Sequence, residues 1–84
     1  MKYYTQFLVR YGPNEEIREL LGSDGVFVLD GRNHLGTMIR DSMERIEKLK
    51  NVQPSIVGFS IIKGSRFGDG TEIHRWIIRW KNAV

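Results

Sequence analysis

The stretch that decides the fold is 55-SIVGFSIIKGSRFGDGTEIHRWIIRWK-81. Both of its ends are rich in β-branched and aromatic residues, which suit a pleated and half-buried surface. Between them lies a glycine-rich segment that ends in Asp69-Gly70, a turn signal because both residue types tolerate a positive φ. The stretch therefore predicts a long C-terminal β-hairpin with strands Ser55–Lys63 and Thr71–Lys81, joined by the loop Gly64–Gly70.

A long helix is predicted immediately before the hairpin. Apolar residues recur there at helical spacing on one side of the chain; they are Leu35, Met38, Ile39, Met43, Ile46 and Leu49. Gly36 weakens the first turn, so the helix begins at Asn33 or at Thr37. It ends at Lys50, since Pro54 cannot continue it.

Three further elements are predicted in the first third of the chain. Residues Lys2–Tyr11 alternate between an apolar-aromatic face and a mixed face, which is typical of a strand. Residues Pro13–Leu21 favour a short helix, with Pro13 at its first position and Gly22 as its stop; an ordered loop is the alternative. Residues Val26–Leu29 are continuously apolar, which predicts a central strand buried on both faces.

The predicted order of elements is β-α-β-α-β-β within a single α+β domain that spans residues 1–84. One four-stranded sheet, with the long and the short helix packed on one face, satisfies all the amphipathic patterns. A chain of this length forms one domain with one core.

The composition narrows the class of protein. With 40% hydrophobic and 27% charged residues, the chain is typical of a globular protein. It contains no cysteine, which excludes disulfides, thiolate zinc sites, iron–sulfur ligation and cysteine nucleophiles and fits a reducing compartment. No signal-peptide core and no apolar run approaching about 18 residues is visible. We therefore expect a cytoplasmic protein with no membrane partner.

The net charge of +3 is concentrated in the hairpin. Residues 1–54 contain eight basic and eight acidic residues, whereas residues 55–84 contain five basic residues against Asp69 and Glu72. An acidic partner would therefore meet the positive electrostatic field of the protein at the hairpin. The candidate binding residues are the five cations and two apolar neighbours: Lys63, Arg66, Phe67, Arg75, Ile77, Arg79 and Lys81.

Alternation along the last strand separates two faces. Even positions place Glu72 and His74 with a core face that consists of Trp76, Ile78 and Trp80. Odd positions form a contact face of Ile73, Arg75, Ile77, Arg79 and Lys81, whose cations are spaced about 6.5–7 Å apart, similar to phosphates along a nucleic-acid strand. Arginine pairs bidentately with phosphate or carboxylate. The alternative is an ordinary solvated face.

The leading functional hypothesis is a small non-enzymatic binding or inhibitor protein. It would engage an acidic partner, either a protein surface or a nucleic acid, through the basic hairpin. Its size and composition suit an accessory protein of a phage or mobile element, by analogy only. A second hypothesis is a homodimer or a strand-addition complex, because Ile73 and Ile77 give the last strand apolar residues on both faces. Under the opposite interpretation, the cations protect that edge from pairing.

A third hypothesis is a small enzyme or small-ligand binder that uses Asp30, Arg32 and His34. These residues follow a predicted buried strand and precede a helix, where α/β sites often lie. An Asp/His pair can act as a general base, but turn formation and helix capping also explain these residue types. No catalytic motif is recognisable, and with His34 and His74 as the only histidines no metal site or cofactor is expected.

Overall fold

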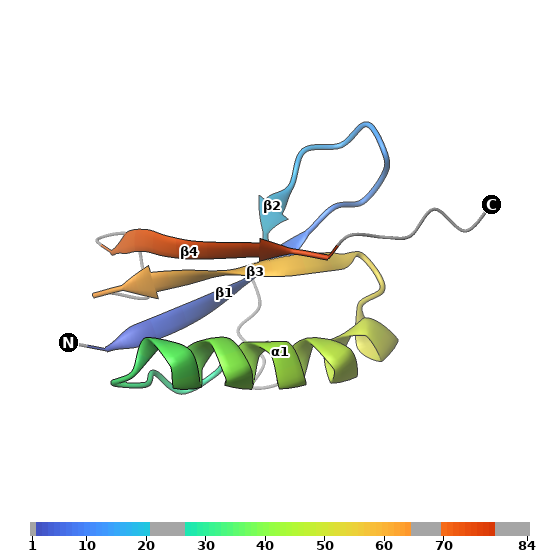
Figure 1. Ribbon diagram of the computed structural model, residues 1–84. Helices are drawn as coiled ribbons and strands as arrows, with labels where there is room; N and C mark the ends of the chain where they lie inside the picture. Colours follow the sequence, from blue (N-terminus) through green and yellow to red (C-terminus); the bar gives the residue numbers. More distant parts are fainter. Residues whose placement is uncertain (1, 21–26, 65–69, 79–84) are drawn as a thin grey trace.

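The computed structural model describes residues 2–20, 27–64 and 70–78. They form an α+β fold in which one helix lies across one face of a four-stranded antiparallel sheet (Figure 1). The elements are β1 (Tyr3–Val9), β2 (Arg18–Glu19), α1 (Leu35–Val52), β3 (Ile56–Lys63) and β4 (Thr71–Ile77). The strand order is β2-β1-β3-β4, so β1 and β3 are central and β2 and β4 form the two edges.

The C-terminal hairpin is confirmed. β3 and β4 pair antiparallel, with Phe59 opposite Trp76 and Lys63 opposite Thr71. Gly64, which follows β3 directly, has a φ of +111°, a conformation that glycine adopts without a steric penalty. Residues 65–69 of the predicted loop and 79–81 of the predicted strand lie outside the described residues.

The first strand and the long helix are also confirmed. β1 covers seven residues of the predicted range and pairs along its whole length with β3. α1 begins at Leu35, after His34 in an extended conformation, and continues two residues beyond Lys50 to Val52. Alternation and helical spacing were sufficient for these elements because each has one face on the core.

The predicted short helix is wrong. Residues 13–20 contain no helix; after a series of turns the chain forms the two-residue strand β2, which pairs with Leu8 and Val9 of β1. Beyond β2, the Leu20 N–H donates a 2.7 Å hydrogen bond to the Phe7 carbonyl. A nine-residue helix is marginal by itself, whereas the edge of β1 offers ready hydrogen-bond partners to the same backbone.

The predicted central strand at residues 26–29 is wrong as well. Among its described residues, 27–29, none belongs to a strand. The chain pairs with the sheet only further on, where Tyr3 and Arg32 exchange two backbone hydrogen bonds of 2.7 and 3.0 Å. Phe27 and Leu29 nevertheless pack on the core. A short apolar run therefore indicated burial correctly, but burial here comes from side-chain packing without strand pairing.

The core lies between the sheet and α1. Its buried side chains come from both central strands and from one stripe of the helix: Phe7, Val9, Ile56, Phe59, Ile61, Met38, Ile46 and Leu49, joined by Leu29. The helix packs over β1 and β3 and makes no comparable approach to β4. The β4 edge of the sheet is therefore left without a helix above it.

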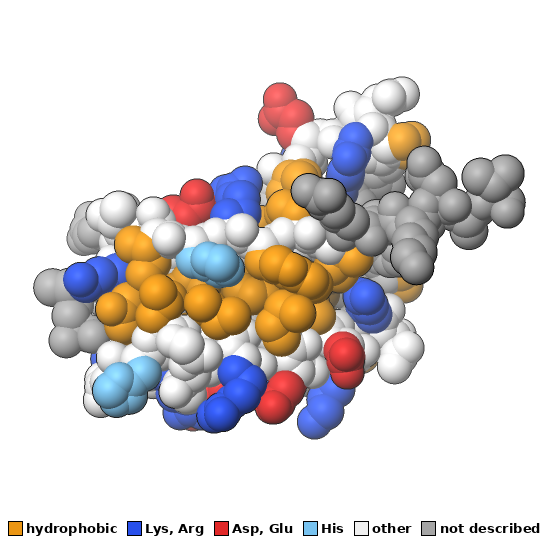
Figure 2. All heavy atoms as spheres, in the orientation of Figure 1, with side chains coloured by type: hydrophobic (Ala, Val, Ile, Leu, Met, Phe, Trp, Pro, Cys, Tyr) orange, Lys and Arg blue, Asp and Glu red, His pale blue; other side chains and the backbone are white. Residues whose placement is uncertain are grey.

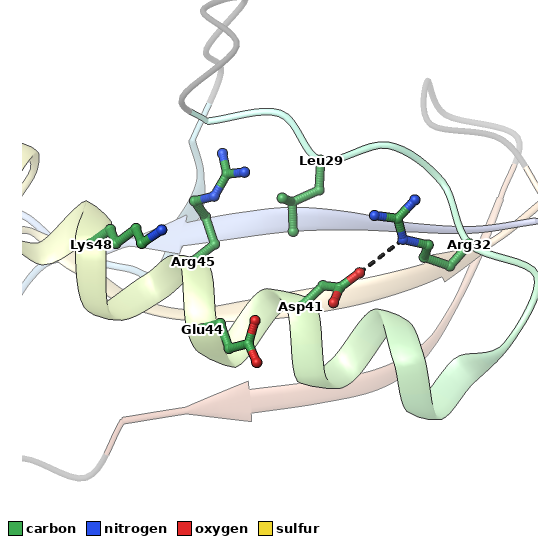
Figure 3. A pocket seen from close by; sticks show the side chains of 6 residues that line it. All are labelled: Leu29, Arg32, Asp41, Glu44, Arg45 and Lys48. Carbon is green, nitrogen blue, oxygen red and sulfur yellow. Dashed lines mark hydrogen bonds and ion pairs between the residues drawn. The ribbon is translucent and has the colours of Figure 1, made fainter.

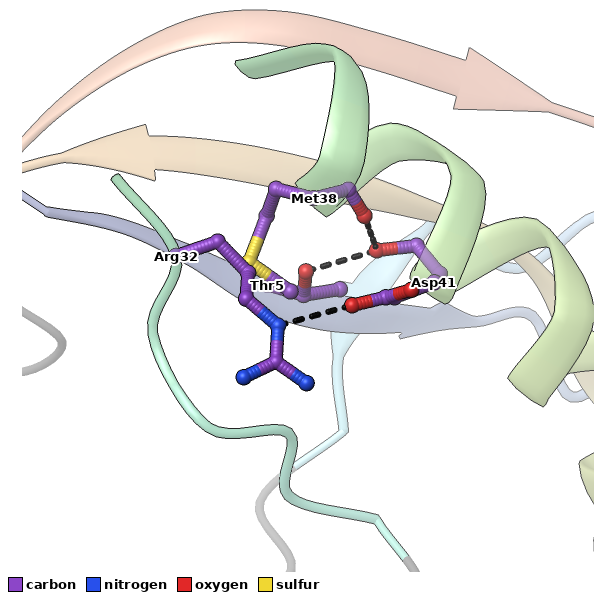
Figure 4. A network of polar contacts seen from close by, with 5 residues as sticks. Thr5, Arg32, Met38 and Asp41 are labelled. Atoms are coloured by element: carbon purple, nitrogen blue, oxygen red, sulfur yellow. Dashed lines mark hydrogen bonds and ion pairs between the residues drawn. The ribbon is translucent and has the colours of Figure 1, made fainter. Parts of the chain in front are cut away.

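A buried polar contact joins the helix to the sheet (Figure 4). The Ser42 hydroxyl donates to the Met38 carbonyl oxygen at 2.7 Å, and the hydroxyl oxygens of Ser42 and Thr5 lie 2.7 Å apart. Because the single proton of Ser42 is committed to Met38, the Thr5 hydroxyl must be the donor in the second bond. The Thr5 hydroxyl therefore needs Ser42 as its acceptor, whereas the hydrogen bond from Ser42 to Met38 does not involve Thr5.

This asymmetry predicts unequal effects on the free energy of unfolding. Ser42→Ala leaves the buried Thr5 hydroxyl without its acceptor and should cost about 1–3 kcal/mol. Thr5→Val keeps the bond from Ser42 to Met38 and should cost less than about 1 kcal/mol. Urea denaturation followed by circular dichroism measures both, and equal losses would contradict the assigned direction of the bond.

Candidate functional site

An irregularity in β4 changes which side chains share a face. Ile61 of β3 pairs with His74, and the next residue, Ile62, pairs with Glu72, so Ile73 is an extra residue in β4. A bulge of this kind shifts the alternation by one position. Glu72 therefore lies on the face of Arg75, opposite the helix, and not on the Trp76 face where simple alternation placed it.

Glu72 and Arg75 form an ion pair on that face. The Arg75 Nε atom lies 2.8 Å from Glu72 Oε1, and the Ser60 hydroxyl donates to the same oxygen. These bonds, from Ser60 first and then from Arg75, hold the pKa of Glu72 below its usual value. Both side chains are more than a third exposed, so the pair contributes only about 0.2–1 kcal/mol to stability. The positive charge of Arg75 therefore lies directly beside the negative charge of Glu72.

The structure places three of the seven candidate binding residues. Lys63 is exposed at the end of β3, Arg75 is exposed and paired, and Ile77 is half-buried in β4. Arg66, Phe67, Arg79 and Lys81 lie outside the described residues, as does Trp80 of the predicted core face. Trp76 and Ile78 do pack against the core, as alternation predicted for that face.

β4 presents an open strand edge. In the described part of the chain it pairs with β3 alone, whereas the other edge of the sheet consists of the two-residue strand β2. The Ile78 N–H donates to the Val57 carbonyl of β3 at 2.6 Å. Because the backbone groups of an antiparallel strand alternate in direction, those of Ile77 and Arg75 point away from β3. They form a row available to another strand.

An apolar band runs beside this edge, between α1 and β4 (Figure 2). The helix contributes half-buried Leu35 and Ile39 and the exposed Met43, β4 contributes Trp76, and Ile78 follows directly after β4. Met43 is 37% exposed. We use the name apolar band for these five residues. These apolar side chains lie next to a strand edge that has no partner strand within residues 2–20, 27–64 and 70–78, and such a combination is typical of an interaction surface.

Helical spacing fixes the direction in which the apolar residues of α1 point. Leu35, Ile39 and Met43 are four residues apart and flank one side of the buried stripe. The other flank of the stripe faces the segment near Arg32, which is joined to β1. Since β4 lies on the far side of β3 from β1, the flank that contains Met43 faces the β4 edge.

The opposite flank of α1 forms a small pocket of about 200 Å³ (Figure 3). Its lining mixes signs of charge: Leu29, Arg32, Asp41, Glu44, Arg45 and Lys48. Arg32 Nε lies 2.8 Å from Asp41 Oδ2, and this hydrogen bond raises the pKa of the arginine above its ordinary value. The pocket is thus lined by neighbouring charges of both signs, which is typical of a solvated helix face.

The three residues of the enzyme hypothesis do not converge on that pocket. Arg32 lines it and is bound to Asp41, whereas Asp30 and His34 are exposed and are not part of the lining. Asp30 influences Arg32 only through its charge. Within the described residues, no group of three or more potential ligands could hold a metal ion. The helix that those residues contain is too polar to cross a membrane.

The sequence contained part of the signal for the apolar band. Helical spacing places Leu35, Ile39 and Met43 on the same side as the other apolar residues of the helix, because spacing alone gives a wide apolar stripe. Only the strand order shows that the helix covers β1 and β3 and leaves one margin of this stripe above the sheet edge.

No protein-family model, no curated protein and no solved structure matches the chain significantly.

Proposed function

We propose that this protein acts by non-enzymatic binding through its C-terminal hairpin, and that it binds an extended polypeptide segment at the open edge of β4. The observation that carries the proposal is the apolar band beside a seven-residue edge strand. Strand addition uses main-chain hydrogen bonds for affinity and adjacent side-chain surfaces for specificity. The β4 edge supplies the first and the apolar band supplies the second.

The two surfaces support each other energetically. An added strand alone would exchange water hydrogen bonds for backbone hydrogen bonds, with a small net gain per bond. Removing Met43 and its apolar neighbours from water adds about 25 cal/mol per Å² of buried apolar surface. The bulge at Ile73 inserts one extra residue between Glu72 and His74, so an added strand has to match this irregularity at the edge.

A peptide probe tests this proposal. Peptides selected from a random library for binding to the folded protein should perturb the amide resonances of Arg75 and Ile77 and the methyl resonance of Met43. Met43→Lys should weaken these peptides by about tenfold or more, because a lysine disfavours an apolar contact. The matched control is Val52→Lys, a change to the same side chain at a position of α1 that is 63% exposed and outside the apolar band. Peptides that instead map to the pocket near Arg45 would contradict the proposal.

Binding of an acidic partner through the charges of the hairpin is the alternative within the same class. Its support among the described residues is the exposed Lys63, since Arg75 already faces Glu72. Nucleic acid of mixed sequence, titrated at low salt and again at higher salt, distinguishes the two. Charge-driven binding should weaken steeply with salt, whereas peptide binding at the apolar band should not.

A further inference from the structure

We infer that the strand received by the β4 edge comes from a second copy of this chain, giving a homodimer in which β4 pairs antiparallel with β4 about a two-fold axis next to the bulge. This inference rests on the proposed function and adds to it the identity of the partner. The result would be one continuous eight-stranded sheet with both helices on the same face, since a two-fold axis perpendicular to a sheet preserves its faces.

The backbone fits such a pairing. Beyond the bulge the alternation resumes, so the outward-pointing residues of β4 are Ile77, Arg75 and then Glu72. An axis between Ile73 and His74 places Arg75 of one copy opposite Glu72 of the other. Both have outward backbone groups, so these two residues can exchange the pair of hydrogen bonds that an antiparallel ladder requires.

The side chains fit the same register. Glu72 and Arg75 lie on one face of the sheet because of the bulge, and they already form an ion pair within one chain. In the dimer each carboxylate would lie opposite the guanidinium of the second copy, which makes two ion pairs into one network of four charges. An axis at Arg75 would instead oppose two arginines. Charge complementarity therefore selects both a second copy as occupant and one register.

The dimer also covers the apolar band. Each helix lies above β1 and β3, so the two helix axes would be separated by four strand spacings, or about 19 Å. A helix with its side chains is about 10–12 Å wide. The apolar band would become a narrow groove between the two helices. Ile39 and Met43 of both copies would line its sides, and Trp76 of both copies would line its base. A single added peptide strand would leave the band open on one side.

The interface is modest in size. A seven-residue strand is about 24 Å long, and the apolar band is about one helix wide. This places the contact at or below the lower end of the range for stable protein interfaces. We therefore expect dimerisation in the micromolar range, visible as a mass that depends on concentration.

Sedimentation equilibrium of the full chain over a wide concentration range provides the first test. The mass should rise from 9.8 kDa toward twice that value as the concentration increases. Met43→Lys should raise the dimer dissociation constant by at least about tenfold, and Val52→Lys should leave it unchanged. Circular dichroism of both variants checks that they remain folded. A dimer that is insensitive to Met43→Lys would overturn the inference.

A charge-exchange experiment tests the register. Glu72→Arg alone should weaken the dimer, because arginines would then face arginines, and Arg75→Glu alone should weaken it because glutamates would face glutamates. An equimolar mixture of the two variants should restore association as a heterodimer, since every facing pair is again of opposite sign. Both side chains are more than a third exposed, but Glu72→Arg also removes the acceptor of the buried Ser60 hydroxyl, so circular dichroism of each variant checks that it remains folded. Failure of the mixture to associate would overturn this register.

The outcomes separate the two proposals. A chain that stays monomeric at every concentration, and yet binds selected peptides at β4, would overturn the homodimer and keep the proposed function. A chain that neither self-associates nor binds such peptides at β4 would overturn both.

Discussion

Gly58→Ala should destabilise the protein at the upper end of the range of about 1–3 kcal/mol seen for overpacked positions, or beyond it. A β-carbon at residue 58 would lie far inside contact distance of the Trp76 carbonyl oxygen and 3.0 Å from the Ile77 α-carbon. Both are backbone atoms of the neighbouring strand, so no side chain can rotate away to relieve the contact. The strands β3 and β4 would have to separate at Ile77, where Gly58 pairs with it.

The same substitution elsewhere provides the control. At Gly36, in the first turn of α1, an added β-carbon meets no atom within 4 Å outside the local helix backbone. Gly36→Ala should therefore raise stability by roughly 0.5–1 kcal/mol, because alanine is the better helix former. Urea denaturation of the two variants should shift the midpoint in opposite directions. A shift in the same direction would contradict the close approach of β3 and β4 at Gly58.

The contrast between these glycines shows what the sequence could predict. Alternation, turn chemistry and β-propensity agree within residues 55–81, and the two predicted hairpin strands are confirmed over Ile56–Lys63 and Thr71–Ile77. For Gly36 the sequence allowed a helix start either at Asn33 or at Thr37, and the structure places this glycine inside the first turn of α1. The sequence contained no sign that Gly58 lies against β4, because that proximity arises only when β3 and β4 are placed side by side and bring Gly58 next to Trp76 and Ile77.

The two wrong elements have a common physical cause. Pro13–Leu21 had helical signals and Val26–Leu29 had strand signals, but each segment is too short for local preference to determine its structure. Residues 18–19 pair with the edge of β1 and form β2, and the side chains of Phe27 and Leu29 pack against the core. In each case a contact distant in sequence outweighed a local propensity.

The candidate site was predictable only in outline. An edge strand near residues 73–77 was anticipated from the apolar residues on both of its faces. The bulge at Ile73 was not, since one extra residue in a strand leaves no mark in a pattern of alternating side chains. That single residue brings Glu72 beside Arg75, and with it comes the charge pattern from which the register of the dimer is inferred.

Phe59→Ala should give the second large effect, a loss of about 3–5 kcal/mol in the free energy of unfolding. Phe59 is 0% exposed at the centre of β3, and its ring centroid lies 5.6 Å from that of Trp76 and 6.3 Å from that of His74. A chain of 84 residues has a total stability of about 4–13 kcal/mol. The substitution would therefore remove a large share of it and leave a population of unfolded chains measurable by circular dichroism.

Two variants make this result specific. Phe59→Leu keeps most of the volume and should cost less than about 1.5 kcal/mol, so the difference from Phe59→Ala measures the cavity. Val52→Ala, at an exposed apolar position of α1, should change stability by no more than about 0.5 kcal/mol.

The Phe59 ring also packs against Trp76, so in Phe59→Leu the tryptophan loses this aromatic neighbour while the fold persists. If the apolar band depends on a fixed Trp76, Phe59→Leu should weaken dimerisation by more than its small effect on folding would suggest. An unchanged dissociation constant would show that the position of Trp76 is set by β4 alone.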